Sequence, residues 1–296
     1  MVHWRSEIKQ MTKGMAFLSP WLIGFTVFMV LPIGLSLYLS FCSYPLLQPP
    51  VFVGLHNYRA MWHDSVFWET LRNTGYYALL TLPAGMVIAI GAALLLNSRI
   101  RGITIYRAII FLPSLVPLVA SSMVWLWLFN TRLGFINTLL RYLGVVHPPG
   151  WLTTTQWAMP ALAIMSFWGL GNTIVIYLAG LQNVPAEMYE SAEIDGAGLV
   201  RQIWHVTLPG ISPIIFFNLI MAIIGVVQNF TVPYVMTQGG PDRATYLLTM
   251  YLYDNAFSFL HMGYASAMAW VELLIVLFLT AIAFWSSRHW VHYQGK

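Results

Sequence analysis

Long runs of apolar residues, separated by short polar stretches, dominate the hydrophobic pattern of this 296-residue chain. Most runs approach or exceed about 20 residues, the length that an α-helix needs to cross a hydrocarbon core of about 30 Å. The pattern predicts six membrane-spanning helices, at about residues 16–41, 73–97, 106–130, 155–181, 213–237 and 264–286. We therefore expect an all-α integral membrane protein with a single transmembrane domain over residues 1–296.

Composition agrees with this class. Hydrophobic residues make up 58% of the chain and charged residues only 8%, and the mean hydropathy is +0.69. A soluble domain of this length could not cover its surface with so few charges. The sequence pI is about 9.2, but the chain contains no run of basic residues, so we expect no nucleic-acid partner.

One polar segment, residues 183–212, interrupts the pattern between the fourth and fifth predicted spans. It holds four of the ten acidic residues of the chain: Glu187, Glu190, Glu193 and Asp195. Pro185 suits the first turn of a helix, and Gly196 can adopt the left-handed conformation that ends one. A second short helix is expected from about Leu199 to Val206, and Leu208-Pro209 should close it. The segment is therefore predicted to be a helical hairpin.

The residue pattern of this segment fits two roles equally well. Met188, Ala192 and Leu199, with acids beside them, suit a surface that docks on a partner protein. The alternative is a solvated loop that merely joins two spans.

The distribution of positive residues predicts the orientation. With both termini in the cytoplasm, the inner set is Arg5, Lys9, Lys13, Arg99, Arg101, Arg107, Arg201, Arg288 and Lys296, and the outer set is Arg59, Arg72, Arg132, Arg141 and Arg243. This bias follows the positive-inside rule. It predicts a cell-membrane protein that presents residues 183–212 to the cytoplasm.

The fourth and fifth predicted spans carry polar and small residues at helical spacing. In the fifth span Asn218, Ala222, Gly225 and Asn229 form one stripe, with Gln228 beside it. In the fourth, the patch consists of Trp168, Gly169 and Asn172. An aromatic face with amide groups suits a sugar, so these residues are candidates for a substrate path. Close helix packing is the alternative, above all for Gly169, Ala222 and Gly225.

Two further features lie inside predicted spans. Glu272 is the only carboxylate well inside one, and it could serve a proton relay, contact a substrate or bind a partner chain. In the second span Gly85, Ala89 and Ala93 recur every four residues and predict a face for helix packing.

Sequence motifs for enzymatic chemistry are missing from the printed sequence. No Gly-x-x-x-x-Gly-Lys-Ser/Thr occurs, and the lysines are Lys9, Lys13 and Lys296. His-Glu-x-x-His and Gly-x-Ser-x-Gly are also missing. We expect no catalytic residues, no metal site and no cofactor bound by this chain.

The polar segment resembles the "EAA" signature of importer permeases, the membrane subunits of binding-protein-dependent ATP-binding-cassette (ABC) transporters. Glu190-Ser191-Ala192 is followed after three residues by Gly196, and after nine more by Val206-Thr207-Leu208-Pro209. Ser191 replaces the family's second residue, and Val206 replaces an isoleucine. Further stretches resemble the carbohydrate-uptake branch of this family: Gly54-Leu55-His56-Asn57-Tyr58, Asn73-Thr74, Leu112-Pro113, Gly134-Phe135-Ile136-Asn137, Thr237-Gln238-Gly239-Gly240-Pro241 and Gly263-Tyr264-Ala265-Ser266-Ala267.

This resemblance implies a six-span ABC importer permease of type I that translocates a sugar by alternating access. It implies that residues 183–212 form a coupling helix on an ATPase, through Glu187, Glu190, Ser191, Ala192, Asp195, Gly196, Leu208 and Pro209. It also implies a substrate path near the middle of the membrane, lined by spans four and five. The expected partners are a second permease subunit, two ATPase subunits that use ATP and Mg, and an extracytoplasmic solute-binding protein.

Two alternatives for the function remain at this point. The same kind of permease could carry glycerol phosphate or another polar solute. A protein of a different class, an ion-coupled secondary transporter, would use Glu272 as its proton site, although such proteins commonly show two related halves and no internal repeat is found here.

Overall fold

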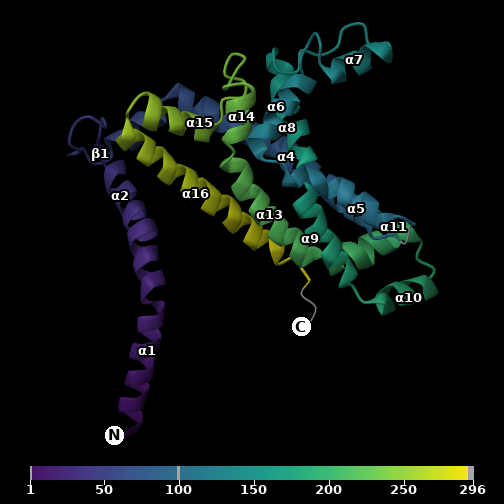
Figure 1. Cartoon of the computed structure of the whole chain (residues 1–296), viewed down its shortest axis with the longest axis horizontal. Helices are drawn as coiled ribbons and strands as arrows, with labels where there is room; N and C mark the ends of the chain where they lie inside the picture. The colour runs from purple at the N-terminus through teal and green to yellow at the C-terminus, as the bar shows by residue number, and fades with distance from the viewer. Residues whose placement is uncertain (1, 99–100, 293–296) are drawn as a thin grey trace. The chain divides into compact units, whose positions relative to one another are not determined.

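The computed structural model of the protein describes residues 2–98 and 101–292, which are mostly helical (Figure 1). Arg99 and Lys296, which contributed to the predicted orientation, lie outside these described residues. The chain forms two compact units: Met1–Asp64 with Leu252–Val271, and Ser65–Tyr251 with Glu272–Lys296. The first predicted span belongs to the smaller unit, and the second to fifth spans belong to the larger one.

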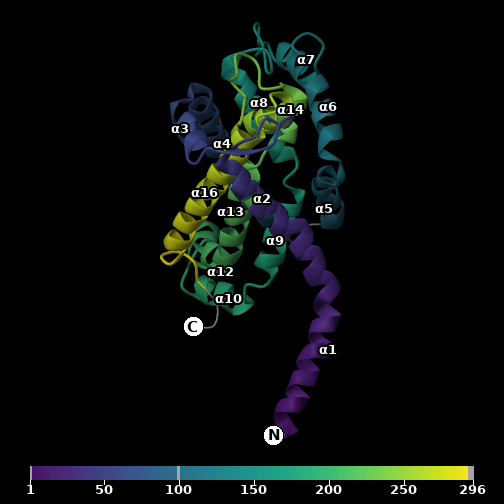
Figure 2. The same cartoon turned by 90° about the vertical axis from the view of Figure 1, so that its left-hand side faces the viewer.

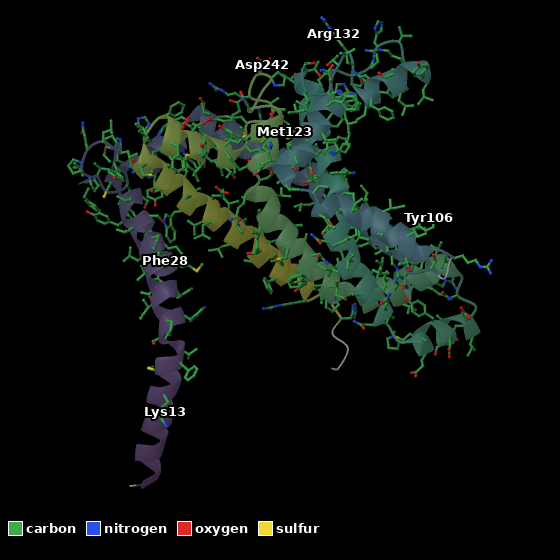
Figure 3. The ribbon with its side chains drawn as sticks, viewed as in Figure 1. Lys13, Phe28, Tyr106, Met123, Arg132 and Asp242 are labelled. Atoms are coloured by element: carbon green, nitrogen blue, oxygen red, sulfur yellow. The ribbon has the colours of Figure 1, made fainter. Side chains whose placement is uncertain are left out.

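The smaller unit begins with one continuous span made of α1 (Val2–Phe25), η1 (Thr26–Val30) and α2 (Leu31–Ser40). Most of its described side chains from Phe17 onward are exposed; Phe28, for example, is 80% exposed (Figure 3). An antiparallel hairpin of β1 (Cys42–Ser43) and β2 (Val51–Phe52) follows, and then α3 (His56–His63). Apolar side chains that stay exposed along a helix of this length suit contact with lipid or with another membrane helix.

The stretch from Gly54 to Tyr58 ties α3 to the end of α2. The amide nitrogen of Asn57 donates hydrogen bonds to the carbonyl oxygens of Ser40 (2.8 Å) and Cys42 (2.9 Å). The Tyr58 hydroxyl donates to the Ser40 hydroxyl at 2.8 Å. A helix leaves its last carbonyl groups without partners inside the helix, and here Asn57 supplies one for Ser40.

In the larger unit, α4 (Ser65–Leu96) packs against α8 (Thr155–Trp168), α9 (Gly171–Gln182) and α13 (Ser212–Val227). Both views place α7 (Phe135–Tyr142) at one end of this unit and α10 (Ala186–Ile194) at the opposite end (Figures 1 and 2). The other helical elements of the chain are α5 (Ile103–Phe111), η2 (Leu112–Leu115), α6 (Leu118–Leu128), α11 (Leu199–Gln202), η3 (Ile203–Thr207), α12 (Leu208–Gly210), α14 (Thr231–Met236), α15 (Leu248–Tyr253), η4 (Asp254–Ser258) and α16 (Met262–Ser287).

The six predicted spans are present, but only three of them are unbroken. Among the described residues, the helices long and apolar enough to cross a membrane alone are Phe17–Ser40, Ser65–Leu96 and Met262–Ser287. Three further pairs of helices qualify together, each bent at a short break: Ile103–Leu115 with Leu118–Leu128, Thr155–Trp168 with Gly171–Gln182, and Leu199–Gly210 with Ser212–Val227, the last bent by 68° at Ile211. The helices differ from the predicted spans at two limits: α4 already begins at Ser65, before residue 73, and α13 ends at Val227, before residue 237.

The break in the third span lies at Val116-Pro117, where the two parts meet at 100°. Pro117 has no N–H group, and its ring disfavours the helical conformation for the residue before it. Val116 accordingly has an extended ψ of 130°.

The break in the fourth span lies at Gly169-Leu170, with a bend of 50°. Gly171 opens the second part, α9, and lies directly against the third span. A Cβ atom at this position would meet the Ser114 hydroxyl at 2.8 Å and the backbone of Ile110 and Phe111 at 3.1 Å. Glycine therefore allows the broken parts of the third and fourth spans to touch.

The fifth span is interrupted after Val227, and the chain resumes as α14 at Thr231. The carbonyl oxygen of Val227, at the end of α13, accepts a hydrogen bond from the Thr249 hydroxyl at 2.9 Å. A side chain of α15 thus provides a partner for a backbone group near the break.

The packing face predicted in the second span is confirmed. Ala89 and Ala93 are fully buried in a cluster that includes Ile174, Tyr177 and Leu178 of α9. Small side chains on α4 let the two helices approach closely. Sequence analysis missed a second contact of this kind, in which Gly180 of α9 lies directly against Ile214 of α13.

The loops at the α7 end of the larger unit are held by asparagine side chains that each donate two hydrogen bonds. Asn73 donates to the carbonyl oxygens of Arg243 (2.8 Å) and Tyr246 (3.2 Å). Asn137 donates to Thr131 (3.1 Å) and Pro149 (3.0 Å), and its own oxygen accepts from the Trp151 indole at 2.7 Å.

Replacing Asn137 by alanine should lower the thermal stability of the purified protein in detergent. Asn137 is fully buried, so its loss leaves one indole N–H and two carbonyl groups to find other partners, at about 1–3 kcal/mol for a buried polar group left unsatisfied. Asn97→Ala, at an exposed position at the end of α4, is the matched control. Equal melting temperatures for the two variants would contradict this role of Asn137.

Candidate functional site

The breaks in the third, fourth and fifth spans line one pocket of about 580 Å³ in the larger unit. Each broken span contributes residues at or next to its break: Pro113, Ser114 and Val116 from the third, Trp168, Gly169 and Leu170 from the fourth, and Gly225, Val226 and Asn229 from the fifth. Irregular backbone at membrane depth is tolerated where it is buried in protein or lines a polar cavity. The volume lies within the usual range of about 300–1,000 Å³ for small-molecule sites.

Six of the nine residues considered for a substrate role line this pocket. They are Trp168, Gly169, Asn172, Ala222, Gly225 and Asn229. The other three, Asn218, Gln228 and Glu272, do not belong to its lining residues. Gln228 is exposed and directly follows the last residue of α13.

The pocket combines one accessible aromatic ring with uncharged polar groups. Trp168 is 37% exposed, and Trp125 of α6 meets it edge-to-face at 6.3 Å between ring centroids. Such a contact fixes the orientation of an indole. Amide groups come from Asn172 and Asn229, and hydroxyl groups come from Tyr77, Ser114, Ser121, Ser166 and Thr173. The Tyr77 hydroxyl is close enough to Ser166 and Asn229 to interact with both side chains.

Charged side chains are absent from the residues that line this pocket. Of the outer arginines, Arg141 donates to the carbonyl oxygens of Thr131 and Arg132, each at 3.0 Å. Arg243 forms an ion pair with Glu69 at 3.4 Å, at an exposed position. The described part of the pocket therefore offers hydrogen bonds and an aromatic face, and offers no cation for a phosphate group.

The pocket glycines are not close-packed within this chain. A Cβ atom at Gly225 would meet no heavy atom within 4 Å, and one at Gly169 would meet only the Ser166 carbonyl oxygen, at 3.8 Å. Gly171 and Gly180, by contrast, lie directly against neighbouring helices. Close helix packing therefore explains the glycines at positions Gly171 and Gly180 better than it explains Gly169 and Gly225.

Glu272 lies outside the pocket lining and has a partner within the chain. It is only 7% exposed, and its carboxyl Oε1 is 3.3 Å from the Thr249 hydroxyl. The same hydroxyl binds the carbonyl oxygen of Val227. Glu272 is thus linked through the Thr249 hydroxyl to the backbone at the break after Val227. Among the described residues, no group of three His, Cys, Asp or Glu side chains could hold a metal ion.

The polar segment between the fourth and fifth spans forms the predicted hairpin. Its first helix, α10, ends at Ile194, and Gly196, two residues further on, has the expected left-handed backbone with φ +74°. The Ala197 N–H bonds to the Ala192 carbonyl at 2.9 Å, and the Gly196 N–H bonds to Glu193 at 2.9 Å, a common way to close a helix.

The second half of the hairpin is longer than predicted. Helical structure continues through α11, η3 and α12 to Gly210, so Leu208-Pro209 does not close it near Val206. Residues 203–207 form a wider π-turn, in which the Leu208 N–H bonds to the Ile203 carbonyl. A π-turn changes the backbone hydrogen-bond pattern just before Pro209, which has no N–H group, and so helps the helix to continue through it.

The hairpin is attached to the transmembrane core on one side. The Tyr189 hydroxyl of α10 lies 3.1 Å from the Thr207 hydroxyl, and the Gln202 amide donates to the Ala197 carbonyl at 3.1 Å. Val184 and Val206 are buried in the same cluster as Ala89 and Tyr177. Tyr189 thus ties α10 to η3, and the two buried valines anchor the hairpin in the cluster formed by α4 and α9.

The other side of the hairpin is exposed. Among the residues predicted for coupling, Glu187, Glu190, Ser191, Asp195 and Gly196 are exposed, and Leu208 and Pro209 are half-buried. Met188 and Leu199 are exposed as expected. Ala192 is half-buried and packs on the chain's own core, so it is less accessible than Met188 and Leu199.

Sequence analysis missed three exposed apolar residues on the hairpin: Ile194, Val200 and Trp204. Ile194 is 87% exposed, at the end of α10. The signal available in the sequence was a large apolar residue beside acids in an otherwise polar segment. Together with Leu199, these side chains give the hairpin an apolar surface next to its carboxylates.

Comparison with known families gives a match over most of the chain. Residues 82–291 match the family described as "Binding-protein-dependent transport system inner membrane component". The match begins inside α4 and includes the hairpin and every lining residue of the pocket except Tyr77.

Curated relatives match over nearly their whole length. A probable ABC transporter permease protein, YesP of Bacillus subtilis, is 41% identical over 99% of this chain and 96% of its own. The sulfoquinovosyl glycerol transport system permease protein SmoG of Agrobacterium fabrum is 35% identical over 90% of this chain and 87% of its own. The lactose transport system permease protein LacF of Rhizobium radiobacter is 34% identical over 96% of this chain and 97% of its own.

A solved structure shares the fold. A chain of a bacterial ABC transporter involved in the import of the acidic polysaccharide alginate superimposes with a TM-score of 0.84 at 23% identity, covering 98% of this chain and 99% of that one. Membership in this family overturns the alternative of an ion-coupled secondary transporter with Glu272 as its proton site. The chain belongs to the family of inner-membrane components of binding-protein-dependent transport systems, and it is a multi-pass permease of the ABC importer type.

Proposed function

We propose that this permease carries a sugar or sugar-like solute across the membrane, and that the pocket at the three helix breaks binds this cargo. The observation that carries the proposal is the make-up of the pocket: an accessible Trp168, the amides of Asn172 and Asn229, and no charged lining side chain. An aromatic face packs on the apolar face of a sugar ring, and amides exchange hydrogen bonds with its hydroxyl groups.

The relatives support this class of cargo. Those named for lactose and for sulfoquinovosyl glycerol, and the importer of alginate, all handle carbohydrates. Glycerol phosphate is a weaker alternative, because this chain brings no arginine or lysine to the pocket. We therefore propose that the cargo meets this chain through hydroxyl groups.

ATP hydrolysis is assigned in this proposal to separate subunits. The printed sequence has no phosphate-binding Gly-x-x-x-x-Gly-Lys-Ser/Thr loop. The complete transporter would contain a second permease subunit, two ATPase subunits that bind ATP and Mg, and an extracytoplasmic binding protein. The outer loops near 43–70, 131–153 and 238–262 would face the binding protein. The hairpin and both termini would face the cytoplasm, as the distribution of positive residues predicts.

The hairpin would transmit the motion of the ATPase subunits to the pocket. Two straight helices join them: α9 runs from the break at Gly169-Leu170 down to the hairpin, and α13 runs from the hairpin up to the break after Val227. At 1.5 Å per residue, their 12 and 16 residues correspond to roughly 18 and 24 Å. A displacement of α10 would therefore move both helices as rigid bodies and change access to the pocket.

The role of the pocket is tested with two neighbouring amides. Asn229→Ala should lower ATP-dependent uptake of labelled sugars by the complete transporter in proteoliposomes by about tenfold, the equivalent of one or two lost hydrogen bonds. Asn172→Ala should have a similar effect. Gln228→Ala is the matched control, because Gln228 lies outside the pocket lining and should leave uptake unchanged. Equal uptake by all three variants at equal protein levels would refute the pocket assignment.

Coupling through the hairpin is tested with two glycines. Gly196→Val places a branched side chain at φ +74°, at a cost of about 1–2 kcal/mol, and should distort the end of α10. Gly198→Val is the control, because Gly198 has an ordinary φ of −70° and open space around it. We expect the Gly196 variant, and also Glu190→Ala, to lose most substrate-stimulated ATP hydrolysis while remaining in the membrane. Normal stimulation in both variants would contradict the coupling role.

A further inference from the structure

A second cavity, of about 260 Å³, adjoins the pocket at the helix breaks. The two share six lining residues: Tyr77, Ser166, Leu170, Thr173, Ala222 and Val226. The second cavity has its own residues as well, among them Thr81, Phe167, Tyr177 and Asn218. Its volume is far above the roughly 15 Å³ that a single water molecule requires.

Tyr177 provides the first sign of a ligand in this cavity. Its side chain on α9 is completely buried, yet its hydroxyl has no hydrogen-bond partner among the residues that the structure describes. A buried polar group without a partner is costly and is uncommon in native proteins. A hydroxyl kept in such a place is therefore available to something that enters the cavity.

Asn218 on α13 complements this hydroxyl. Its amide nitrogen donates to the Ile214 carbonyl of its own helix at 3.1 Å, which leaves the side-chain oxygen to accept a hydrogen bond. Phe167 adds an aromatic ring to the wall, and no charged residue lines the cavity. The second cavity thus offers a hydrogen-bond donor, an acceptor and an aromatic ring, the same kinds of group that line the first pocket.

The second cavity lies nearer to the hairpin than the first. Tyr177 is five residues beyond Asn172 on α9, which corresponds to about 7.5 Å along the helix. Asn218 precedes Ala222 by four residues on α13, or about 6 Å. Both displacements point toward residues 183–212, because α9 leads into that segment and α13 leads out of it.

From this arrangement we infer that the second cavity is a further carbohydrate subsite, which holds the next ring of a cargo already bound at Trp168. The inference rests on the proposed function and specifies the substrate class as a carbohydrate or glycoside of at least two ring units. Tyr177 would donate to a hydroxyl group of the inner ring, and Asn218 would accept from one.

The test compares uptake of carbohydrates of different length. The complete transporter in proteoliposomes containing ATP would be given a mixture of neutral carbohydrates of one to five rings, from partial hydrolysis of a plant polysaccharide. Mass spectrometry of the vesicle contents then measures the rate for each length. Tyr177→Phe removes only the hydroxyl and should slow species of two or more rings by about five- to tenfold, the equivalent of one hydrogen bond. Single-ring species should be unaffected.

Tyr76→Phe, a half-exposed neighbour of Tyr77 outside both cavities, is the control and should change nothing. Asn218→Ala should reproduce the length-dependent defect and serves as the second variant if Tyr177→Phe folds poorly. Unchanged rates in both variants would overturn the inference, since the hydroxyl would then bind only water. Equal slowing of all lengths, or a wild-type transporter that imports single rings only, would also overturn it.

These outcomes are distinct from a failure of the proposed function. Asn229→Ala, which alters the first pocket, should slow every length in the same experiment. If wild-type vesicles accumulate no carbohydrate of any length, the proposed function and the subsite fall together. If Asn229→Ala slows uptake while Tyr177→Phe and Asn218→Ala do not, only the subsite is lost.

Discussion

Where a helix breaks inside a membrane, its backbone N–H and C=O groups lose their partners within the helix and must form other hydrogen bonds. This constraint organises the larger unit of the permease. The breaks in the third and fourth spans and the interruption after Val227 meet at one polar pocket. Hydroxyl and amide side chains gather there, and the Thr249 hydroxyl donates to the carbonyl oxygen of Val227. Interrupted helical backbone would be costly against lipid, but here it creates a site for a polar solute.

The same breaks separate fixed parts of the chain from parts that could move. Between the pocket and the hairpin, α9 and α13 are unbroken and packed closely at Gly180 and Ile214. On the opposite side, the loops around α7 are tied by Asn73 and Asn137 to backbone carbonyl groups. In the proposed mechanism, rigid helices carry motion from the hairpin, and the interrupted backbone at the pocket accommodates it.

Much of this site could be predicted from the sequence, because the signals were local. The polar stripes predicted six residues that meet in the pocket, and Gly196 ends its helix as its position suggested. The rest depended on tertiary structure. Pro117 was visible, but a proline within an apolar run also occurs in unbroken helices, as Pro83 does in α4. Gln228 and Asn229 both follow the end of α13, and only the tertiary structure shows that Asn229 lines the pocket while Gln228 does not. Tyr177 in an apolar span gave no sign that its hydroxyl would lack a partner.

The central claim is that the three helix breaks together form the cargo site. A cryo-electron microscopy structure of the complete transporter with bound carbohydrate tests it most directly. The account predicts a sugar ring stacked on Trp168, with hydroxyl groups about 3 Å from Asn172 and Asn229 and next to the third-span break at Ser114. Carbohydrate bound elsewhere in the membrane region, with these breaks packed only against protein or lipid, would contradict it.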